Sequence, residues 1–232
     1  RSHRQFPYGT FVNESLPVER RWSWILTSRE GSYALDGQLS YSFDLKKPWD
    51  DPENVKMKCR AHLDDMDPEL KGHEGSAQRL QALLCPSAGD LEPTPSGIGV
   101  TNYVGMAGVG VDAALGPLAP TSGIFGYDRN CTVANIRDGI SYTMIVLETN
   151  QRLGPWSAGG PWTVRGVDDT ALPVMGVGRQ FGGLHRGGAT VGMADGSGRF
   201  FQEEMDARVF MALTTAAGDD GKAIPRGMID EL

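Results

Sequence analysis

The 232-residue sequence has no apolar run approaching the roughly 18 residues that a membrane-spanning helix needs. It also lacks basic runs, because 22 Lys and Arg stand against 29 Asp and Glu and the formal net charge is −7. Nucleic-acid binding depends on cationic side chains that neutralise phosphates, so this charge balance excludes nucleic acid as an expected partner. Hydrophobic residues make up 40% of the chain and aromatic residues 8%, which is typical of a folded globular protein rather than a disordered one.

Cysteine is scarce. Cys59, Cys85 and Cys131 are the three cysteines, and no two of them have CxxC spacing, which argues against a cysteine-built zinc cage. An odd number permits one disulfide and one free thiol. Cys85 and Cys131 both lie in loop-like surroundings and form the candidate disulfide if the compartment is oxidising. Three reduced thiols that behave as small hydrophobic residues are the alternative.

Glycine and proline are plentiful, with 31 and 14 residues, and such a chain favours short strands and shaped loops over a helix bundle. We predict strands over residues 101–111 and 143–147. A hairpin is expected over 189–201, with Asp195-Gly196 as its two-residue turn. One helix is predicted over 206–217, with Asp206 as N-cap and Gly218 as the C-terminal stop. The predicted fold class is therefore α+β, mostly antiparallel β.

Several short segments follow one another in a particular order. They are WSWIL (22–26), PWDDPEN (48–54), LLCPS (83–87), NYVGMAG (102–108), SGIFG (122–126), NIRDGISYTMIVLE (135–148), HRGGATVGMADG (185–196) and SGRFF (197–201). In the segment 185–196, nine residues separate His185 from Asp195-Gly196, which gives an H-x9-DG pattern. Together these segments resemble the planctomycete family of pilin-like proteins with the prepilin-type processing-associated H-x9-DG signature.

The resemblance implies a pilin-like globular head similar to those of type II secretion pseudopilins and type IV pilins. It implies that residues 1–20 are a lead-in after a missing N-terminal hydrophobic helix, that 21–218 form a single head domain, and that 219–232 are a polar tail. The missing helix would anchor the full-length form in the inner membrane at first. The expected location is extracytoplasmic, in the cell envelope or at the cell surface, and the expected partners are copies of the chain or other pilin-like subunits.

The signature histidine and aspartate are expected to have structural roles at separate places. Ten residues of extended strand span roughly 33 Å, so His185 and Asp195 cannot readily share a ligand. Asp195-Gly196 would form a turn, as would Asp138-Gly139. Glu148, which ends the apolar run TMIVL, is the partner that we predict for His185.

Three further possibilities come from the remaining residues. Asp64, Asp65 and Asp67 could form part of a calcium site, as could the acidic group at 50–53, although no EF-hand spacing is present; no other cofactor is expected. Trp156 and Trp162 could stack on sugar rings or fill a subunit interface, with core packing as the default. Catalysis by His185 would require a serine and a carboxylate in close contact with it.

The main hypothesis from the sequence is a non-enzymatic, pilin-like structural subunit of a filament or secretion-type assembly. A glycan- or solute-binding module of the cell envelope is the alternative, because the family has also been grouped with solute-binding proteins. A hydrolase using His185 is the third.

Overall fold

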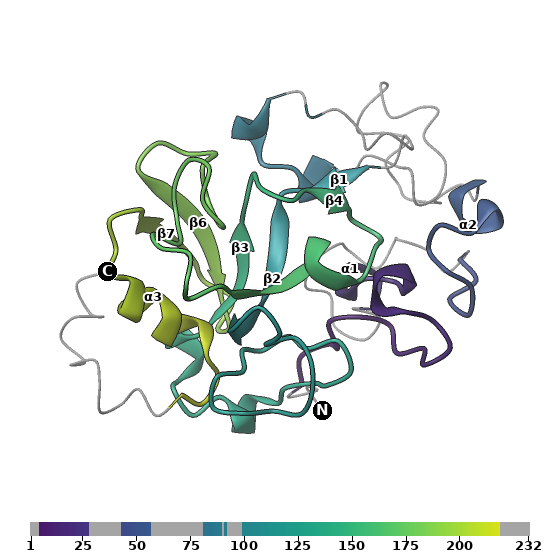
Figure 1. Ribbon diagram of the computed structural model, residues 1–232, viewed down its shortest axis with the longest axis horizontal. Helices are drawn as coiled ribbons and strands as arrows, with labels where there is room; N and C mark the ends of the chain where they lie inside the picture. Colours follow the sequence, from purple (N-terminus) through teal and green to yellow (C-terminus); the bar gives the residue numbers. More distant parts are fainter. Residues whose placement is uncertain (1–4, 28–42, 57–80, 90, 92–98, 219–232) are drawn as a thin grey trace.

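The computed structural model describes residues 5–27, 43–56, 81–89, 91 and 99–218 (Figure 1). The α-helices of this part of the chain are α1 (Trp24–Thr27), α2 (Pro52–Lys56) and α3 (Ala207–Thr214). The strands are β1 (Val100–Thr101), β2 (Tyr103–Val109), β3 (Met144–Glu148), β4 (Gly154–Pro155), β5 (Val164–Val167), β6 (Gly188–Met193) and β7 (Gly198–Gln202). Short 3₁₀ turns connect them, of which η5 (Gln81–Leu83), η6 (Pro86–Ala88) and η8 (Ile140–Tyr142) position the residues discussed below.

Five of the strands form one sheet in the order β5-β2-β3-β6-β7, and β1 pairs with β4 separately. All pairs are antiparallel except β2 with β5, which run parallel. The prediction of an α+β, strand-rich fold is therefore confirmed. The predicted strands over 101–111 and 143–147 correspond to β1 with β2 and to β3, each displaced by one or two residues at its ends.

The β6–β7 hairpin is present, but its turn differs from the predicted one. Met193 N donates to Ser197 O and Gly196 N donates to Met193 O, so the loop has three residues, Ala194 to Gly196. A two-residue type I′ turn needs positive φ at both central positions, whereas here Gly196 alone has it, at +86°. A type I turn followed by a left-handed glycine satisfies the same Asp-Gly sequence.

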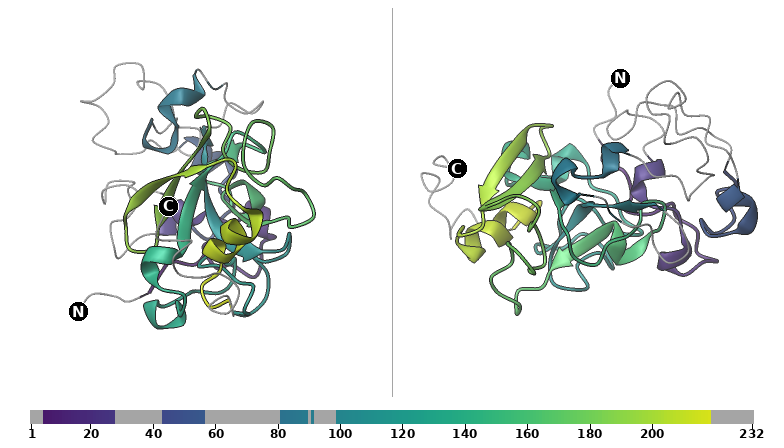
Figure 2. Two further views of the ribbon diagram at one scale, coloured as in Figure 1. Left: turned by 90° about the vertical axis from the view of Figure 1, so that its left-hand side faces the viewer. Right: turned by 90° about the horizontal axis from the view of Figure 1, so that it is seen from above.

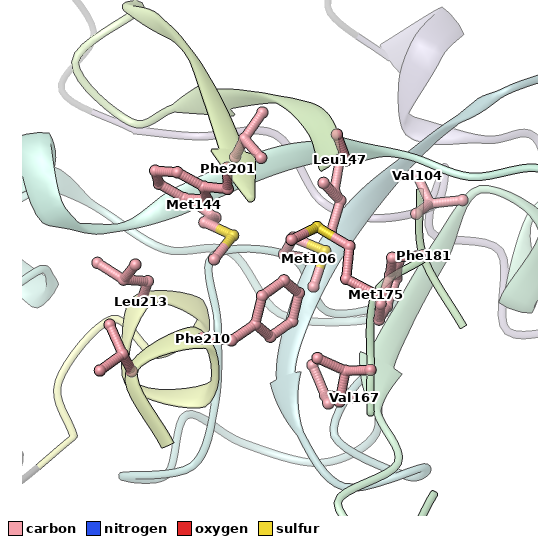
Figure 3. Packing of buried hydrophobic residues seen from close by; sticks show 14 of the residues in the cluster. Val104, Met106, Met144, Leu147, Val167, Met175, Phe181, Phe201, Phe210 and Leu213 are labelled. Atoms are coloured by element: carbon pink, nitrogen blue, oxygen red, sulfur yellow. The ribbon is translucent and has the colours of Figure 1, made fainter. Parts of the chain in front are cut away.

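One face of the sheet packs against α3 in the largest apolar cluster. Alternate residues of the strands point to this face, and Phe210 and Leu213 of α3 lie against Met144 and Phe201 (Figure 3).

The predicted N-cap is present, since Asp206 Oδ1 accepts a hydrogen bond from Arg208 N at 2.8 Å. The prediction that Gly218 ends this helix is wrong.

The helix α3 ends at Thr214, well before Gly218, and two interactions explain this early end. The hydroxyl of Thr214 donates to Met211 O within the last turn. The next residues are held by a carboxylate from another segment, because Asp138 Oδ2 accepts from Thr215 Oγ1 at 3.2 Å and from Gly218 N at 2.9 Å. The chain therefore leaves the helix in extended conformation toward Asp138.

The opposite face of the sheet is covered by a second cluster that includes Trp24, Phe125 and Trp156. The helices α2 and α3 lie at opposite ends of the molecule in two perpendicular views (Figures 1 and 2). Among the described residues, no helix combines the length and the apolar character required to cross a bilayer.

Candidate functional site

Strand β3 places a carboxylate on the second face of the sheet. Leu147 points into the apolar cluster beneath α3, so the next residue, Glu148, points to the other side. Tyr103 lies across from it on β2, and Thr190 lies beside it on β6. The Glu148 side chain is only 1% exposed, which is unusual for an acidic residue at the end of a strand.

The loop between η5 and η6 brings Cys85 to this carboxylate. Asn102 is buried and holds the loop in place, because its Oδ1 accepts from Cys85 N at 3.0 Å while its Nδ2 donates to Thr149 O. Asn102 N also donates to Leu83 O. One asparagine thus connects the LLCPS segment to the carboxyl end of β3.

The segment before β6 supplies the histidine. Gly182 N donates to Glu148 O and Asn150 N donates to Gly182 O, so this segment runs beside the end of β3. His185 then begins a tight turn and forms a bridge with Gly188. Gly187 has φ of +79° in this turn, a conformation that glycine adopts without strain.

The three side chains converge on one nitrogen of the imidazole. Nε2 of His185 lies 3.3 Å from Cys85 Sγ and 3.3 Å from a carboxylate oxygen of Glu148. The sulfur, nitrogen and oxygen all lie within 4.8 Å of one another. On the other side of the ring, Nδ1 lies 3.4 Å from Ser87 Oγ. Phe200 of β7 presents its ring edgewise to the imidazole, with 6.3 Å between the ring centroids.

Burial dominates the electrostatics here. Burial raises the pKa of Glu148, and interactions with His185 and Thr190 oppose this increase. Neither carboxylate oxygen accepts a hydrogen bond of ordinary geometry from the described residues. Burial also raises the pKa of Tyr103, and the neighbouring Cys85 and Glu148 add to that increase. Removal from water thus works against the charged forms of Glu148 and Tyr103.

This geometry can support two kinds of chemistry. In a nucleophile–histidine–carboxylate relay, the carboxylate and the nucleophile occupy opposite ring nitrogens. Ser87 and Glu148 satisfy that condition, whereas Cys85 shares Nε2 with Glu148 and does not. A thiol, an imidazole and a carboxylate directed at one point are instead the ligand types of a transition-metal site.

The Asp195-Gly196 end of the signature lies at the other end of the β6–β7 hairpin and takes no part in this site. Asp195 Oδ1 accepts from Ser197 N at 2.9 Å and from Ser197 Oγ at 2.6 Å, and Asp195 N donates to Ile140 O. The second Asp-Gly pair is adjacent, since Ile140 follows Gly139, whose φ is +99°. The two Asp-Gly turns therefore support each other, and Asp138 in addition holds the end of α3.

The expected disulfide between Cys85 and Cys131 is wrong. Both are free thiols, and they belong to different environments. Cys85 faces His185, whereas Cys131 packs with Ile124 and Ile136 in a small apolar cluster at the end of the sheet. Burial raises the pKa of Cys131 to about 11, so this thiol stays protonated and behaves as a small hydrophobic residue.

Trp156 does not form a sugar-binding surface, because its side chain is fully buried in the cluster behind the sheet. Trp162 is half-buried against the cluster that contains Trp22 and Trp49. Core packing was the default expectation for both side chains, with sugar stacking or a subunit interface as the other possibilities. The loop that carries them turns inward, where Trp162 packs directly on Gly154 and no larger residue would fit.

The acidic groups give no calcium site in the described residues. Asp50 accepts from Arg20, Glu53 pairs with Lys47, and Asp51 accepts from Glu53 N. Each carboxylate of that group thus has a local partner. Asp64, Asp65 and Asp67, the other calcium candidates, lie outside the described residues.

Sequence reasoning identified two of the three converging residues and missed the third. His185 and Glu148 were expected as partners, and the structure brings them together. Cys85 lies 100 residues from His185, and no periodicity links positions so far apart. The available signal was that Cys85, Glu148 and His185 each fall within a different segment of the ordered set that resembles one family.

Comparisons with known proteins identify one family. The family model SBP_bac_10, described as "Protein of unknown function (DUF1559)", matches residues 1–172. The match includes Cys85 and Glu148 and ends before His185. No curated protein and no solved structure matches the chain. Because the model covers well over half of the 232 residues, the chain belongs to the DUF1559 family.

Proposed function

We propose that this chain is a pilin-like structural subunit outside the cytoplasm, and that it acts by contact with other copies of itself. The ordered segments of the sequence support this proposal, as does a strand-rich head of the kind that pilin-like subunits carry. The location rests on that resemblance. The observation that carries the proposed mode of action is a pair of exposed aliphatic side chains on the loop that follows β2.

These side chains are Val111, which is 76% exposed, and Leu115, which is 58% exposed. Because β2 and β5 are parallel neighbours, the loops after them start at the same end of the sheet, and Gly110 N donates to Val167 O at 2.8 Å. The loop after β5 then crosses toward the far edge, where a Cβ at Gly176 would lie 3.1 Å from a Glu203 carboxylate oxygen, so its exposed Val177 is not counted in this surface. Two large aliphatic side chains exposed on one loop form a candidate protein–protein contact.

A buried arginine fixes the first of these loops. Nη1 of Arg129 donates to Leu115 O and Gly116 O, and Nη2 donates to the carbonyls of Ala107, Ala113 and Phe125. One guanidinium thus holds strand and loop in one arrangement. A preformed loop loses little conformational entropy on association, which favours its use as a contact surface.

Sedimentation velocity over a range of protein concentrations tests the proposal. We expect concentration-dependent association of the chain, and we expect Val111→Glu combined with Leu115→Glu to abolish it by placing charges in the contact. Val12→Glu is the matched control, because Val12 is also exposed but lies in the N-terminal segment, and association should persist in it. If the wild type, the double variant and Val12→Glu all fail to associate, or all associate equally, the proposed contact is wrong. Electron microscopy of the full-length protein would then test for a regular helical array.

Hydrolysis is a second candidate, favoured by a specific contact. Ser87, His185 and Glu148 form a serine–histidine–carboxylate series across the two ring nitrogens, which is the contact expected of a catalytic histidine. An active-site-directed fluorophosphonate tests it directly. Labelling of the chain that disappears in Ser87→Ala and persists in Ser141→Ala would support a nucleophilic serine, and absence of labelling would remove this candidate.

A further inference from the structure

We propose that Cys85, Glu148 and His185 bind one divalent transition-metal ion of the zinc type, through Sγ, one carboxylate oxygen and Nε2. The inference does not depend on assembly or on hydrolysis. It concerns a ligand of this chain that neither the sequence nor the family relationship had indicated.

The spacing of the ligand atoms agrees with a tetrahedral ion. Zinc–ligand bonds of about 2.0–2.3 Å place adjacent ligand atoms about 3.4 Å apart for nitrogen and oxygen and about 3.6 Å apart for nitrogen and sulfur. The observed separations from Nε2 are 3.3 Å to the Glu148 oxygen and 3.3 Å to the Cys85 sulfur. The third pair, the Cys85 sulfur and the Glu148 oxygen, lies within 4.8 Å, so the three atoms fit around one ion once this pair closes toward about 3.6 Å.

The Glu148 carboxylate supplies an independent reason. Its side chain is 1% exposed and points toward Cys85 and His185. His185 Nε2, 3.3 Å away, and Thr190 approach the carboxylate, but neither oxygen has a partner in ordinary hydrogen-bond geometry among the described residues. A buried carboxylate without a strong partner is costly to a folded protein. A bound cation would offset that cost, which explains why an acidic residue occupies this position.

The surroundings have the features of a supported metal site. A ligating histidine usually donates its other ring N–H to a nearby acceptor, and Ser87 Oγ lies 3.4 Å from Nδ1. The backbone of Cys85 is fixed by the buried Asn102, as described above. Ligands from three separate segments are thus brought to one point by contacts that the fold makes in any case.

The ligand types select the ion. A thiolate favours zinc and similar ions over calcium and magnesium, which prefer sets made of oxygen atoms. On binding, the Cys85 thiol loses its proton to solvent and the sulfur bonds to the ion, so a dication beside one thiolate and one carboxylate is neutral in total. Three protein ligands leave a fourth position, and the 32% exposure of the His185 side chain lets water reach it.

Cobalt(II) substitution tests the proposal on the intact, untagged chain. We expect one equivalent of cobalt per chain, with a sulfur-to-cobalt charge-transfer band in the near ultraviolet and the visible bands of a tetrahedral ion. Zinc should displace the cobalt and remove both features, and zinc should raise the melting temperature of the metal-free protein. A chain that binds less than one equivalent of either metal, or a cobalt spectrum without the charge-transfer band, would overturn the proposal.

Near-isosteric variants assign the ligands while preserving the packing. Cys85→Ser should remove the charge-transfer band, and Glu148→Gln and His185→Gln should each weaken zinc binding by more than about 100-fold, since even residues behind the ligands contribute 10–100-fold. Cys131→Ser is the matched control, because it removes the other free, buried thiol of the described residues and should leave the metal bound. Circular dichroism shows that each variant is folded. If Cys131→Ser lost the band and Cys85→Ser kept it, the assigned site would be wrong.

Discussion

The two ends of the β6–β7 hairpin are built from similar residues and have different roles. The open end, around Gly188, carries His185 against a thiol and a buried carboxylate. The closed end, around Asp195, carries a turn whose polar groups bond to Ser197 and to Ile140 in the adjacent turn. The difference shows that the nine residues between His185 and Asp195 correspond to one strand with its flanking turns, so the two residues lie in separate environments.

Two glycines of the hairpin give the largest expected contrast. A Cβ at Gly188 would lie 2.1 Å from Phe201 O and 2.6 Å from the Phe200 ring, whereas a Cβ at Gly198 would meet nothing within 4 Å. We expect Gly188→Ala to lower the free energy of unfolding by about 3 kcal/mol and Gly198→Ala to change it by less than about 0.5 kcal/mol. Urea denaturation measures both, and equal effects would mean that the open end is less tightly packed than described.

Asp138 allows the support at the closed end to be measured. Asp138→Ala removes the acceptor for Thr215 Oγ1 and Gly218 N, and we expect a loss of about 1–2 kcal/mol in the free energy of unfolding. Asp138→Asn keeps one carbonyl oxygen and should lose less. Cobalt binding at the open end should be the same in both variants, and its loss would show that the two ends are coupled.

Phe200 tests how far the open end depends on its aromatic neighbour. The ring is 49% exposed and meets the imidazole edgewise, so Phe200→Ala should cost about 0.5–1 kcal/mol, chiefly through the lost ring pair. Phe200→Leu is the control that retains apolar volume. Calorimetric melting of the metal-free proteins gives the comparison, and a loss of several kcal/mol would show that the half-exposed Phe200 ring contributes more than its contact with the imidazole.

The smallest expected effect is the pH dependence of the closed end. The Ser197 hydroxyl and amide, with Ser141 as a further donor, lower the pKa of Asp195 from 3.8 to about 2. The folded state therefore favours the carboxylate. Its contribution to stability is present above pH 3.8 and is lost as the pH falls through about 2. Solvent screening keeps the effect small at this exposed turn.

The difference in urea midpoint between the wild type and Asp195→Asn should accordingly shrink as the pH is lowered from about 5 to about 2. Ser197→Ala, which removes the hydroxyl donor but keeps the carboxylate, should reduce the same pH dependence in part. A difference that stays constant over this range would show that Asp195 is not stabilised as a carboxylate.

Local patterns were enough to predict much of the fold. The short apolar run TMIVL after an Asp-Gly turn located β3, the Asp-Gly pairs located turns, and Asp206 marked the start of α3. The end of that helix was not predictable, because Asp138, some eighty residues earlier, decides it. The turn type was not predictable either, since Asp-Gly suits both a two-residue loop and a three-residue loop.

The candidate site was predicted in part for the same reason. A carboxylate at the end of an apolar strand and a lone histidine before a glycine pair are local signals, and they led to Glu148 and His185. Cys85 reaches them only through the contacts of Asn102, which depend on the assembled sheet. For Trp156 the sequence favoured core packing but left exposure open, because the direction in which a glycine-rich loop turns is set by what it packs against.

Arg129 has a consequence for how this surface can vary between related chains. Its five acceptors are all backbone carbonyls, so none of them depends on which side chain the acceptor residue carries. Substitutions at Val111 or Leu115 would therefore leave the loop in place while changing what it presents to solvent. Related chains that retain this arginine are therefore expected to differ in the side chains that the loop exposes without any change in its backbone.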